Sequence, residues 1–200
     1  MNVVIIKYNA GNVQSVQFAL QRLGINAIVT DDHAEIMAAD KVIFPGVGNA
    51  YSAMESLKEK QLDQLIPKLT QPVLGICVGM QLLCNRSEEN DTTGLGIINL
   101  DVKKFVSDQT EFKIPQVGWN TIEHFSSPLF QGIKEGSFVY YVHSYYVESG
   151  KETIATTNYI IPYSAAIQKD NFYGVQFHAE KSADIGELIL DNFLKMNTCK

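Results

Sequence analysis

A cysteine between two glycines, in the segment Gly75-Ile76-Cys77-Val78-Gly79, is the strongest chemical signal in the sequence. It lies between a buried strand pattern and a helical pattern, the context in which G-x-S-x-G places a nucleophile on a sharp, strained turn. Glycine is needed on both sides because other side chains would collide with the neighbouring strand or helix. The helix amino terminus favours the thiolate by about 0.3–1 kcal/mol. We therefore predict that Cys77 is a nucleophile, with a buried structural cysteine as the alternative.

A catalytic thiol needs a histidine that is close in space, and His178 is the best candidate. It follows the apolar run 172–177, at the end of a predicted strand, where open α/β sheets place their active sites. Glu180 would point to the same side if the chain stays extended, and its carboxylate could then orient the imidazole. The alternative is an exposed His-Glu pair. A zinc deaminase site would also need a P-C-x-x-C segment, which the sequence lacks.

The other three histidines are weaker candidates. His33 and His124 lie in polar segments that are typical of loops. His143 lies in the aromatic run 140–146, where a hydrogen-bonded histidine at a strand end is favoured over direct catalysis.

The segment Pro45-Gly46-Val47-Gly48 follows the apolar run 42–44 and is either a tight turn or part of an oxyanion hole. In the second case it would present backbone N–H groups to a developing oxyanion, with the N–H of Val78 as a further donor. Each such donor typically contributes a rate factor of about 10²–10³.

The elements that must position these groups follow a βαβ pattern in the first part of the chain. Apolar runs at 3–6, 27–29, 42–44 and 72–76 alternate with helical spacing at Val13, Val16, Leu20 and Leu23. Continuous apolar strands imply burial on both faces. The sequence therefore predicts an α/β fold of three layers, with a mostly parallel central sheet flanked by helices.

The second half of the chain has a different sequence pattern. Short runs separated by Gly, Pro, Asn and Ser predict a smaller antiparallel or mixed section with strands at 102–106, 138–142, 153–157, 165–168 and 172–177. Residues 184–196 predict a closing helix with one apolar side. Because no linker or repeat interrupts the chain, we expect one domain over residues 1–200.

Composition excludes several classes of protein. The 200 residues carry a formal net charge of −6, with 46% hydrophobic and 19% charged residues, and no basic stripe suggests a nucleic-acid site. No apolar run approaches a membrane span, and the amino terminus lacks a signal sequence. Of the three cysteines, Cys84 is expected in the core and Cys199 has no expected function. Their odd number, without metal-ligand spacing, favours the cytoplasm and predicts no metal.

Several motifs, in order along the chain, together resemble the class I (triad) glutamine amidotransferases, and most of all the glutaminase subunits of imidazole glycerol phosphate synthase. The matching segments are 8–12 (YNAGN), 45–48 (PGVG), 75–83 (GICVGMQLL), 118–120 (GWN), 142–145 (VHSY) and 174–182 (GVQFHAEKS). The resemblance runs nearly end to end and implies a flavodoxin-like amidotransferase fold.

The resemblance also implies roles for individual residues, with no cofactor. It implies a catalytic triad of Cys77, His178 and Glu180. It implies glutamine binding by Gln81 and by the backbone around His143, Ser144 and Tyr145, and an oxyanion hole formed by Gly46, Val47, Gly48 and Val78. It places Asn12, Trp119, Asn120 and Lys181 at the partner interface and the ammonia passage.

Two positions depart from the usual family pattern. The family has His-Pro-Glu where this chain has His178-Ala179-Glu180, and Pro-His where it has Pro115-Gln116. We expect the loss of the proline to relax the backbone that sets Glu180. We expect Gln116 to alter a position at the partner interface.

The implied reaction is hydrolysis of L-glutamine to L-glutamate and ammonia. Because water would capture ammonia as ammonium, a sealed route to a second active site is needed, and this chain has no room for one. The resemblance implies a heterodimer with a HisF-like (β/α)8-barrel synthase subunit. That partner makes imidazole glycerol phosphate and an aminoimidazole carboxamide ribotide in L-histidine biosynthesis, and its ligand would raise glutaminase activity by ordering the oxyanion strand.

Three alternatives remain open at the level of sequence. A paralogous subunit would supply ammonia to an amidotransferase for surface sugars. A non-catalytic binding module would retain the fold without hydrolysing glutamine. A γ-glutamyl peptidase would act on peptides without any partner.

Overall fold

The computed structural model describes residues 1–9, 12–108, 110 and 112–196. Cys199 and two residues of the amino-terminal motif, Ala10 and Gly11, lie outside the described residues.

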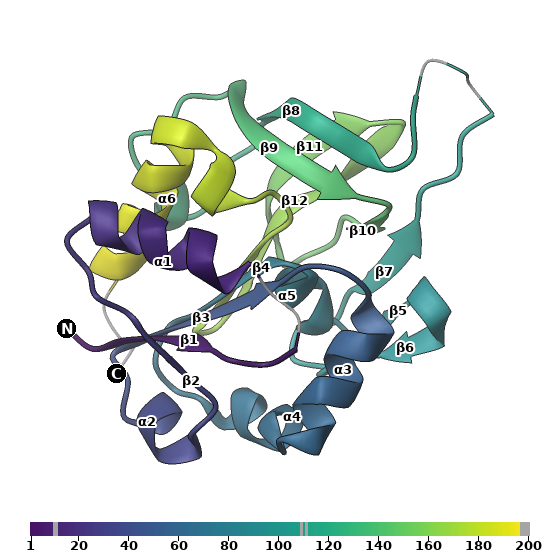
Figure 1. The fold of residues 1–200 in the computed structure, drawn as a ribbon. Coiled ribbons are helices and arrows are strands. Elements are labelled where there is room, and N and C mark those ends of the chain that lie inside the picture. The colour runs from purple at the N-terminus through teal and green to yellow at the C-terminus, as the bar shows by residue number, and fades with distance from the viewer. Residues whose placement is uncertain (10–11, 109, 111, 197–200) are drawn as a thin grey trace.

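The centre of the molecule is a parallel sheet of five strands in the order β2-β1-β3-β4-β13 (Figure 1). These strands are β1 Val3–Ile6, β2 Ile28–Thr30, β3 Lys41–Gly46, β4 Val73–Cys77 and β13 Phe172–Val175. All neighbouring pairs among them run parallel. Every residue of β1, β3, β4 and β13 is buried, which confirms the prediction that both faces of the sheet are covered.

The sheet continues beyond β13 with antiparallel strands, as the sequence pattern of the second half of the chain predicts. They are β12 Ile161–Lys169, β11 Thr153–Tyr159, β10 Tyr145–Val147, β7 Asp101–Lys104, β5 Arg86–Ser87 and β6 Thr92–Thr93. Only the β5–β7 pair in this part is parallel. A separate two-stranded sheet, β8 Gln116–Ile122 with β9 Ser137–His143, is linked to β11 by a bridge between Glu123 and Thr156.

Helices cover both faces of the parallel strands, with α1 and α6 on one side and α3 and α4 on the other (Figure 1). The helices are α1 Val13–Arg22, α2 His33–Met37, α3 Ala50–Glu59, α4 Leu62–Leu65, α5 Val78–Leu82 and α6 Ala183–Lys195. Short 3-10 turns are η1 Ile66–Lys68, η2 Glu89–Asp91, η3 Pro128–Phe130 and η4 Ala179–Lys181. The predicted three-layer α/β fold is confirmed.

The expectation for His33 is wrong. His33 does not lie in a loop but begins α2, because the preceding Asp32 caps the helix by accepting a hydrogen bond from the backbone N–H of Glu35 at 3.0 Å. Asp before the first helical residue is a strong capping signal, and here it outweighs the polar character of the segment.

Candidate active site

Cys77 ends β4 and immediately precedes α5, with φ 54° and ψ −111°. A side chain at Gly79 would bring its Cβ to 1.9 Å from the carbonyl oxygen of Phe44, and one at Gly75 would come within 2.8 Å of the Gly79 backbone. The glycines therefore let α5 pack directly on the strands, and the thiol is held in a backbone conformation that L residues rarely adopt. This is the strained strand-to-helix turn that the motif predicts.

His178 follows β13 and lies 2.8 Å, through Nδ1, from Oε1 of Glu180. Both side chains are buried. Glu180 lies in the 3-10 turn η4, so the expectation of an extended chain is wrong, although the expected contact forms. Burial lowers the pKa of His178, but interactions with Cys77 and Glu180 outweigh it and raise the pKa to about 10. His178 is therefore held as an imidazolium beside the thiol.

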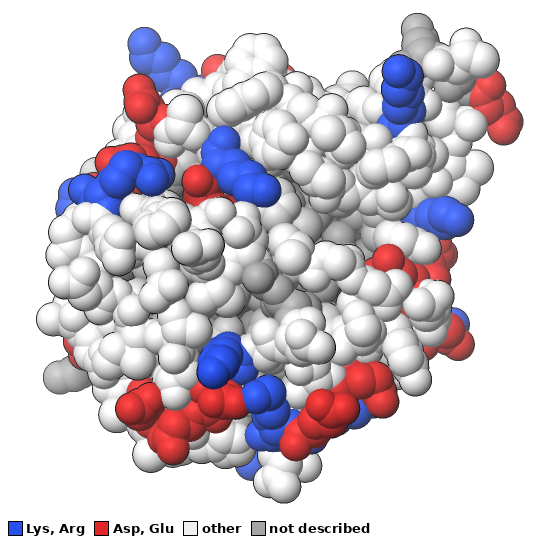
Figure 2. All heavy atoms as spheres, viewed as in Figure 1, with Lys and Arg blue, Asp and Glu red and all other residues white. Residues whose placement is uncertain are grey.

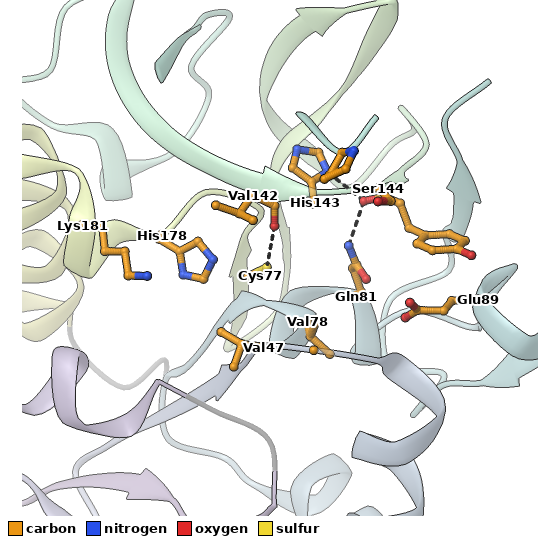
Figure 3. Close-up of a pocket in the computed structure, with 13 residues that line it drawn as sticks. Val47, Cys77, Val78, Gln81, Glu89, Val142, His143, Ser144, His178 and Lys181 are labelled. Atoms are coloured by element: carbon orange, nitrogen blue, oxygen red, sulfur yellow. Dashed lines mark hydrogen bonds between the residues drawn. The ribbon is translucent and has the colours of Figure 1, made fainter. Parts of the chain in front are cut away.

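The thiol of Cys77 faces a cavity of about 340 Å³, into which His178 and Lys181 also point (Figure 3). This volume lies within the range of about 300–1,000 Å³ that is usual for small-molecule sites. The lining residues are Val47, Gly48, Cys77, Val78, Gln81, Glu89, Pro115, Val142, His143, Ser144, Tyr145, His178 and Lys181. The fold therefore brings together residues from six separate segments of the sequence.

The residues with an expected role in glutamine binding form one wall of this cavity. Gln81 Nε2 donates to the carbonyl oxygen of Tyr145 at 2.9 Å and to Oε1 of Gln176 at 2.9 Å. The backbone of Ser144 is fixed as well, because its carbonyl accepts the N–H of Phe105 at 3.0 Å. The side chain of Gln81 thus anchors the wall of the cavity.

The residues of the expected oxyanion hole occupy different positions. Val47, Gly48 and Val78 line the cavity. Gly46 is not among the lining residues, and a Cβ on it would come within 2.5 Å of the Gly79 backbone nitrogen and 2.9 Å of the Tyr8 hydroxyl. Its lack of a side chain is therefore explained by close packing against α5.

The residues expected at the partner interface lie on three separate parts of the fold: before α1, on β8 and in η4. Lys181 lines it, and Trp119 is 52% exposed on β8, edge-on to Tyr140. Asn120 donates to the carbonyl oxygen of Asn158 at 3.1 Å. Asn12, just before α1, accepts a hydrogen bond from the hydroxyl of Ser15 at 2.7 Å.

Gln116, which is expected to alter a position at the partner interface, does not lie on the surface of this chain. Gln116 is buried, and its side-chain amide lies 3.0 Å from the hydroxyl of Tyr163. The alternation of β8 explains this, because Gln116 pairs with the buried His143 while the next residue, Val117, is exposed.

Several residues near the thiol were not predicted from the sequence. Gln176 places Nε2 at 3.7 Å from the Cys77 sulfur, and Val142 places its carbonyl oxygen at 3.9 Å from it. Glu89 lines the cavity, and its Oε2 accepts the backbone N–H of Ala50 at 2.6 Å. A glutamine inside an apolar strand run was an available signal for Gln176, whereas nothing around Glu89 marked it.

Within the described parts of the chain, no group of His, Cys, Asp or Glu side chains is arranged to hold a metal ion. No helix within those parts is both long and apolar enough to cross a membrane.

Comparisons with known proteins show the family to which the whole chain belongs. Residues 4–196 match the glutamine amidotransferase class-I family. The chain is 55% identical over 196 residues to the imidazole glycerol phosphate synthase subunit HisH of Bacteroides fragilis, covering 98% of this chain and 100% of that one. It is 46% identical to HisH of Haemophilus influenzae, with 98% of each chain covered.

Solved structures show the same fold at low sequence identity. A glutamine amidotransferase superposes with a TM-score of 0.75 at 15% identity, over 98% of each chain. PurLQS from Thermotoga maritima superposes with a TM-score of 0.72 at 15% identity, over 96% of this chain and 97% of that one. These likenesses concern the fold alone.

Proposed function

This chain belongs to the class I glutamine amidotransferases, and from that premise we propose that it is the glutaminase subunit of an imidazole glycerol phosphate synthase in histidine biosynthesis. The observation that carries the proposal is the arrangement of Cys77 and His178 on one cavity, with Glu180 fixing the imidazole. The chain acts as one amidotransferase domain over residues 1–200, and it works in the cytoplasm together with its synthase.

Glutamine enters the cavity with its carboxamide toward Cys77 and its amino-acid end toward the wall formed by Gln81, Ser144 and Tyr145. Glu89 is the acidic residue of the cavity lining, so it pairs with the ammonium group of the substrate. Its carboxylate is already oriented by the N–H of Ala50. A charge pair of this kind distinguishes glutamine from amides that lack the α-amino group.

The reaction proceeds through a thioester. The Cys77 thiolate attacks the carboxamide carbon, and the oxygen becomes an oxyanion that the N–H groups of Gly48 and Val78 stabilise. His178, held as an imidazolium, gives its proton to the departing nitrogen, so ammonia leaves and the thioester remains. The now neutral His178 takes a proton from water, whose oxygen attacks the thioester and releases glutamate and the thiolate.

Ammonia is passed to a HisF-like (β/α)8-barrel synthase subunit that binds this chain as a heterodimer. Support comes from the outer face of the β8–β9 sheet, where Val117, Trp119, Phe138 and Val142 are exposed. Charged side chains lie mostly toward the edge of the face seen in Figure 2, and its centre is mostly uncharged. Such a surface suits a stable subunit contact rather than an electrostatic encounter.

The expected partner contacts are Asn12, Trp119, Asn120 and Lys181. Lys181 lies at the cavity, so a partner seated over it would cover the thiol and exclude water. Binding of the synthase ligand would then activate the site through the segment from Gly46 to Gly48, where Gly48 has φ +92°.

Co-expression with a HisF-like barrel tests this proposal. The complex should co-purify, release glutamate from glutamine, and do so faster when the nucleotide substrate of the barrel is present. Cys77→Ala should abolish release while leaving the complex intact. A complex that forms no glutamate would refute the catalytic proposal, failure to co-purify would refute the partner, and equal rates with and without nucleotide would refute the coupling.

A further inference from the structure

A chain of buried polar groups leads from β8 to the wall of the cavity. The Gln116 amide lies 3.0 Å from the Tyr163 hydroxyl, which lies 3.2 Å from Nε2 of His143. Nδ1 of His143 lies 2.8 Å from the carbonyl oxygen of Tyr145. The side chains of Gln116, Tyr163 and His143 are all buried, so these contacts do not exchange freely with water.

The positions of the hydrogens along this series of polar groups follow from which groups can donate and which can only accept. Burial lowers the pKa of His143 to about 4, so the imidazole is neutral near pH 7 and carries one N–H. A carbonyl oxygen only accepts, so that hydrogen is on Nδ1, toward Tyr145. Nε2 must then accept, and the donor within reach is the hydroxyl of Tyr163.

This assignment also settles the role of Gln116. The phenol of Tyr163 has a single hydrogen, and His143 uses it. The atom of the Gln116 amide placed 3.0 Å from the phenol is the acceptor Oε1. Since the phenol hydrogen is used by His143, the amide is turned by half a turn, which puts the donor Nε2 in the place of Oε1. Gln116 thereby leaves the phenol hydrogen directed at His143.

We propose that Gln116 and Tyr163 are positioning residues for glutamine binding, which act by holding His143 as the neutral Nδ1–H tautomer. The inference rests on the proposed function, because it concerns the same cavity. His143 in this form donates to the Tyr145 carbonyl, which also accepts from Gln81. Two donors on one carbonyl fix the peptide of Tyr145, and with it the cavity wall that binds the amino-acid end of glutamine.

The position of this carbonyl links substrate binding to the nucleophile. Gln81 donates to both Tyr145 and Gln176, and Gln176 in turn approaches the Cys77 sulfur. Since Gln116 and Tyr163 touch neither the thiol nor His178 in any of these contacts, their loss should weaken binding of glutamine more than it slows the chemical step.

Steady-state glutaminase kinetics of the complex with the synthase partner test the proposal. Tyr163→Phe keeps the ring but removes the donor, and it should raise the glutamine KM about fivefold to thirtyfold, with kcat changed by less than about twofold. Gln116→Leu should raise KM by a smaller factor, because Tyr163 can still donate. Gln116→His, which retains a donor and an acceptor, should bring KM back toward the wild-type value.

Tyr173→Phe is a matched control, because it removes a buried phenol that accepts from Gln168 outside this chain of groups. It should lower the melting temperature without a change in KM. If Tyr163→Phe and Gln116→Leu lower the melting temperature but leave KM unchanged, their role is structural and the proposal is wrong. If the wild-type complex makes no glutamate, the proposed function itself is refuted, which is a different outcome from an unchanged KM in the variants.

The tautomer of His143 is tested directly in the wild-type chain. Two-bond 1H–15N spectra of protein labelled with 15N-histidine should show the His143 hydrogen on Nδ1 near pH 7, with His143→Asn used for assignment. A hydrogen on Nε2, or on both nitrogens, would overturn the proposal even if no variant folds.

Discussion

Nδ1 of His178 lies 2.8 Å from Oε1 of Glu180, although only Ala179 separates the two residues. The contact forms because the chain turns into η4 directly after His178. The hydroxyl of Ser182 holds this turn by donating to the carbonyl oxygen of His178 at 2.6 Å. The pair is thus oriented by the turn and by Ser182, without the proline that the family usually has at position 179.

Replacement of the carboxylate tests the contribution of this pair to catalysis. We expect Glu180→Gln to lower kcat for glutamine hydrolysis by about 10²–10⁴-fold, because an uncharged amide does not stabilise the imidazolium and does not fix the tautomer of the neutral imidazole that forms after proton transfer. Glutamate release by the complex measures the effect. Glu187→Gln is the control, since Glu187 pairs with Arg22 at the surface, and its rate should match wild type. Equal loss in both variants would contradict a specific role for Glu180.

The raised pKa of His178 predicts how the pair responds to pH. Because the pKa in the folded state is about 10, above the ordinary value of 6.5, the stabilisation is fully present below pH 6.5 and is lost as the pH rises through about 10. NMR titration should find His178 charged at pH 8. Cys77→Ala removes one of the interactions that raise the pKa, so His178 should titrate at lower pH in that variant. An unchanged titration would show that the thiol does not contribute.

Local sequence was sufficient to predict those parts of the local geometry that depend on immediate neighbours. Cys77 between two glycines and His178 at a strand end both carry their signal within a few residues. The contact between His178 and Glu180 was predicted as well, but from an extended chain. In the structure a 3-10 turn brings these two residues together instead. The predicted contact is therefore right, although the predicted backbone conformation is wrong.

Contacts between distant segments were not predictable in the same way. Gln176 reaches Cys77 because β13 and β4 pair in parallel, with Val175 opposite Ile76. Glu89 reaches the cavity from a turn between the two-residue strands β5 and β6, which are too short to leave a hydrophobic pattern. The burial of Gln116 depends on the register between β8 and β9, which no local pattern reveals.

Close packing of α5 on β3 predicts that Gly79 cannot be replaced. A Cβ at Gly79 would lie 1.9 Å from the backbone oxygen of Phe44, which cannot move aside as a flexible side chain could. We expect Gly79→Ala to lower the free energy of unfolding by about 3 kcal/mol or more. Urea denaturation measures the change. Gly24→Ala, where a Cβ meets open space at φ +77°, should cost only about 1–2 kcal/mol. Similar losses would argue against steric exclusion at Gly79.

The backbone at Cys77 should be more stable with glycine than with alanine, because φ 54° and ψ −111° disfavour any residue with a Cβ. Such strain costs about 1–3 kcal/mol, and the greater freedom of glycine in the unfolded chain offsets about 0.4–1 kcal/mol of the gain. We therefore expect Cys77→Gly to unfold at higher urea concentration than Cys77→Ala, with both inactive. Cys84 provides the matched control, since it is buried but is not among the described residues with positive φ. There the order should reverse, with Cys84→Ala more stable than Cys84→Gly. If alanine is the more stable replacement at both positions, the backbone conformation at Cys77 does not lower the stability of the fold, and the prediction is wrong.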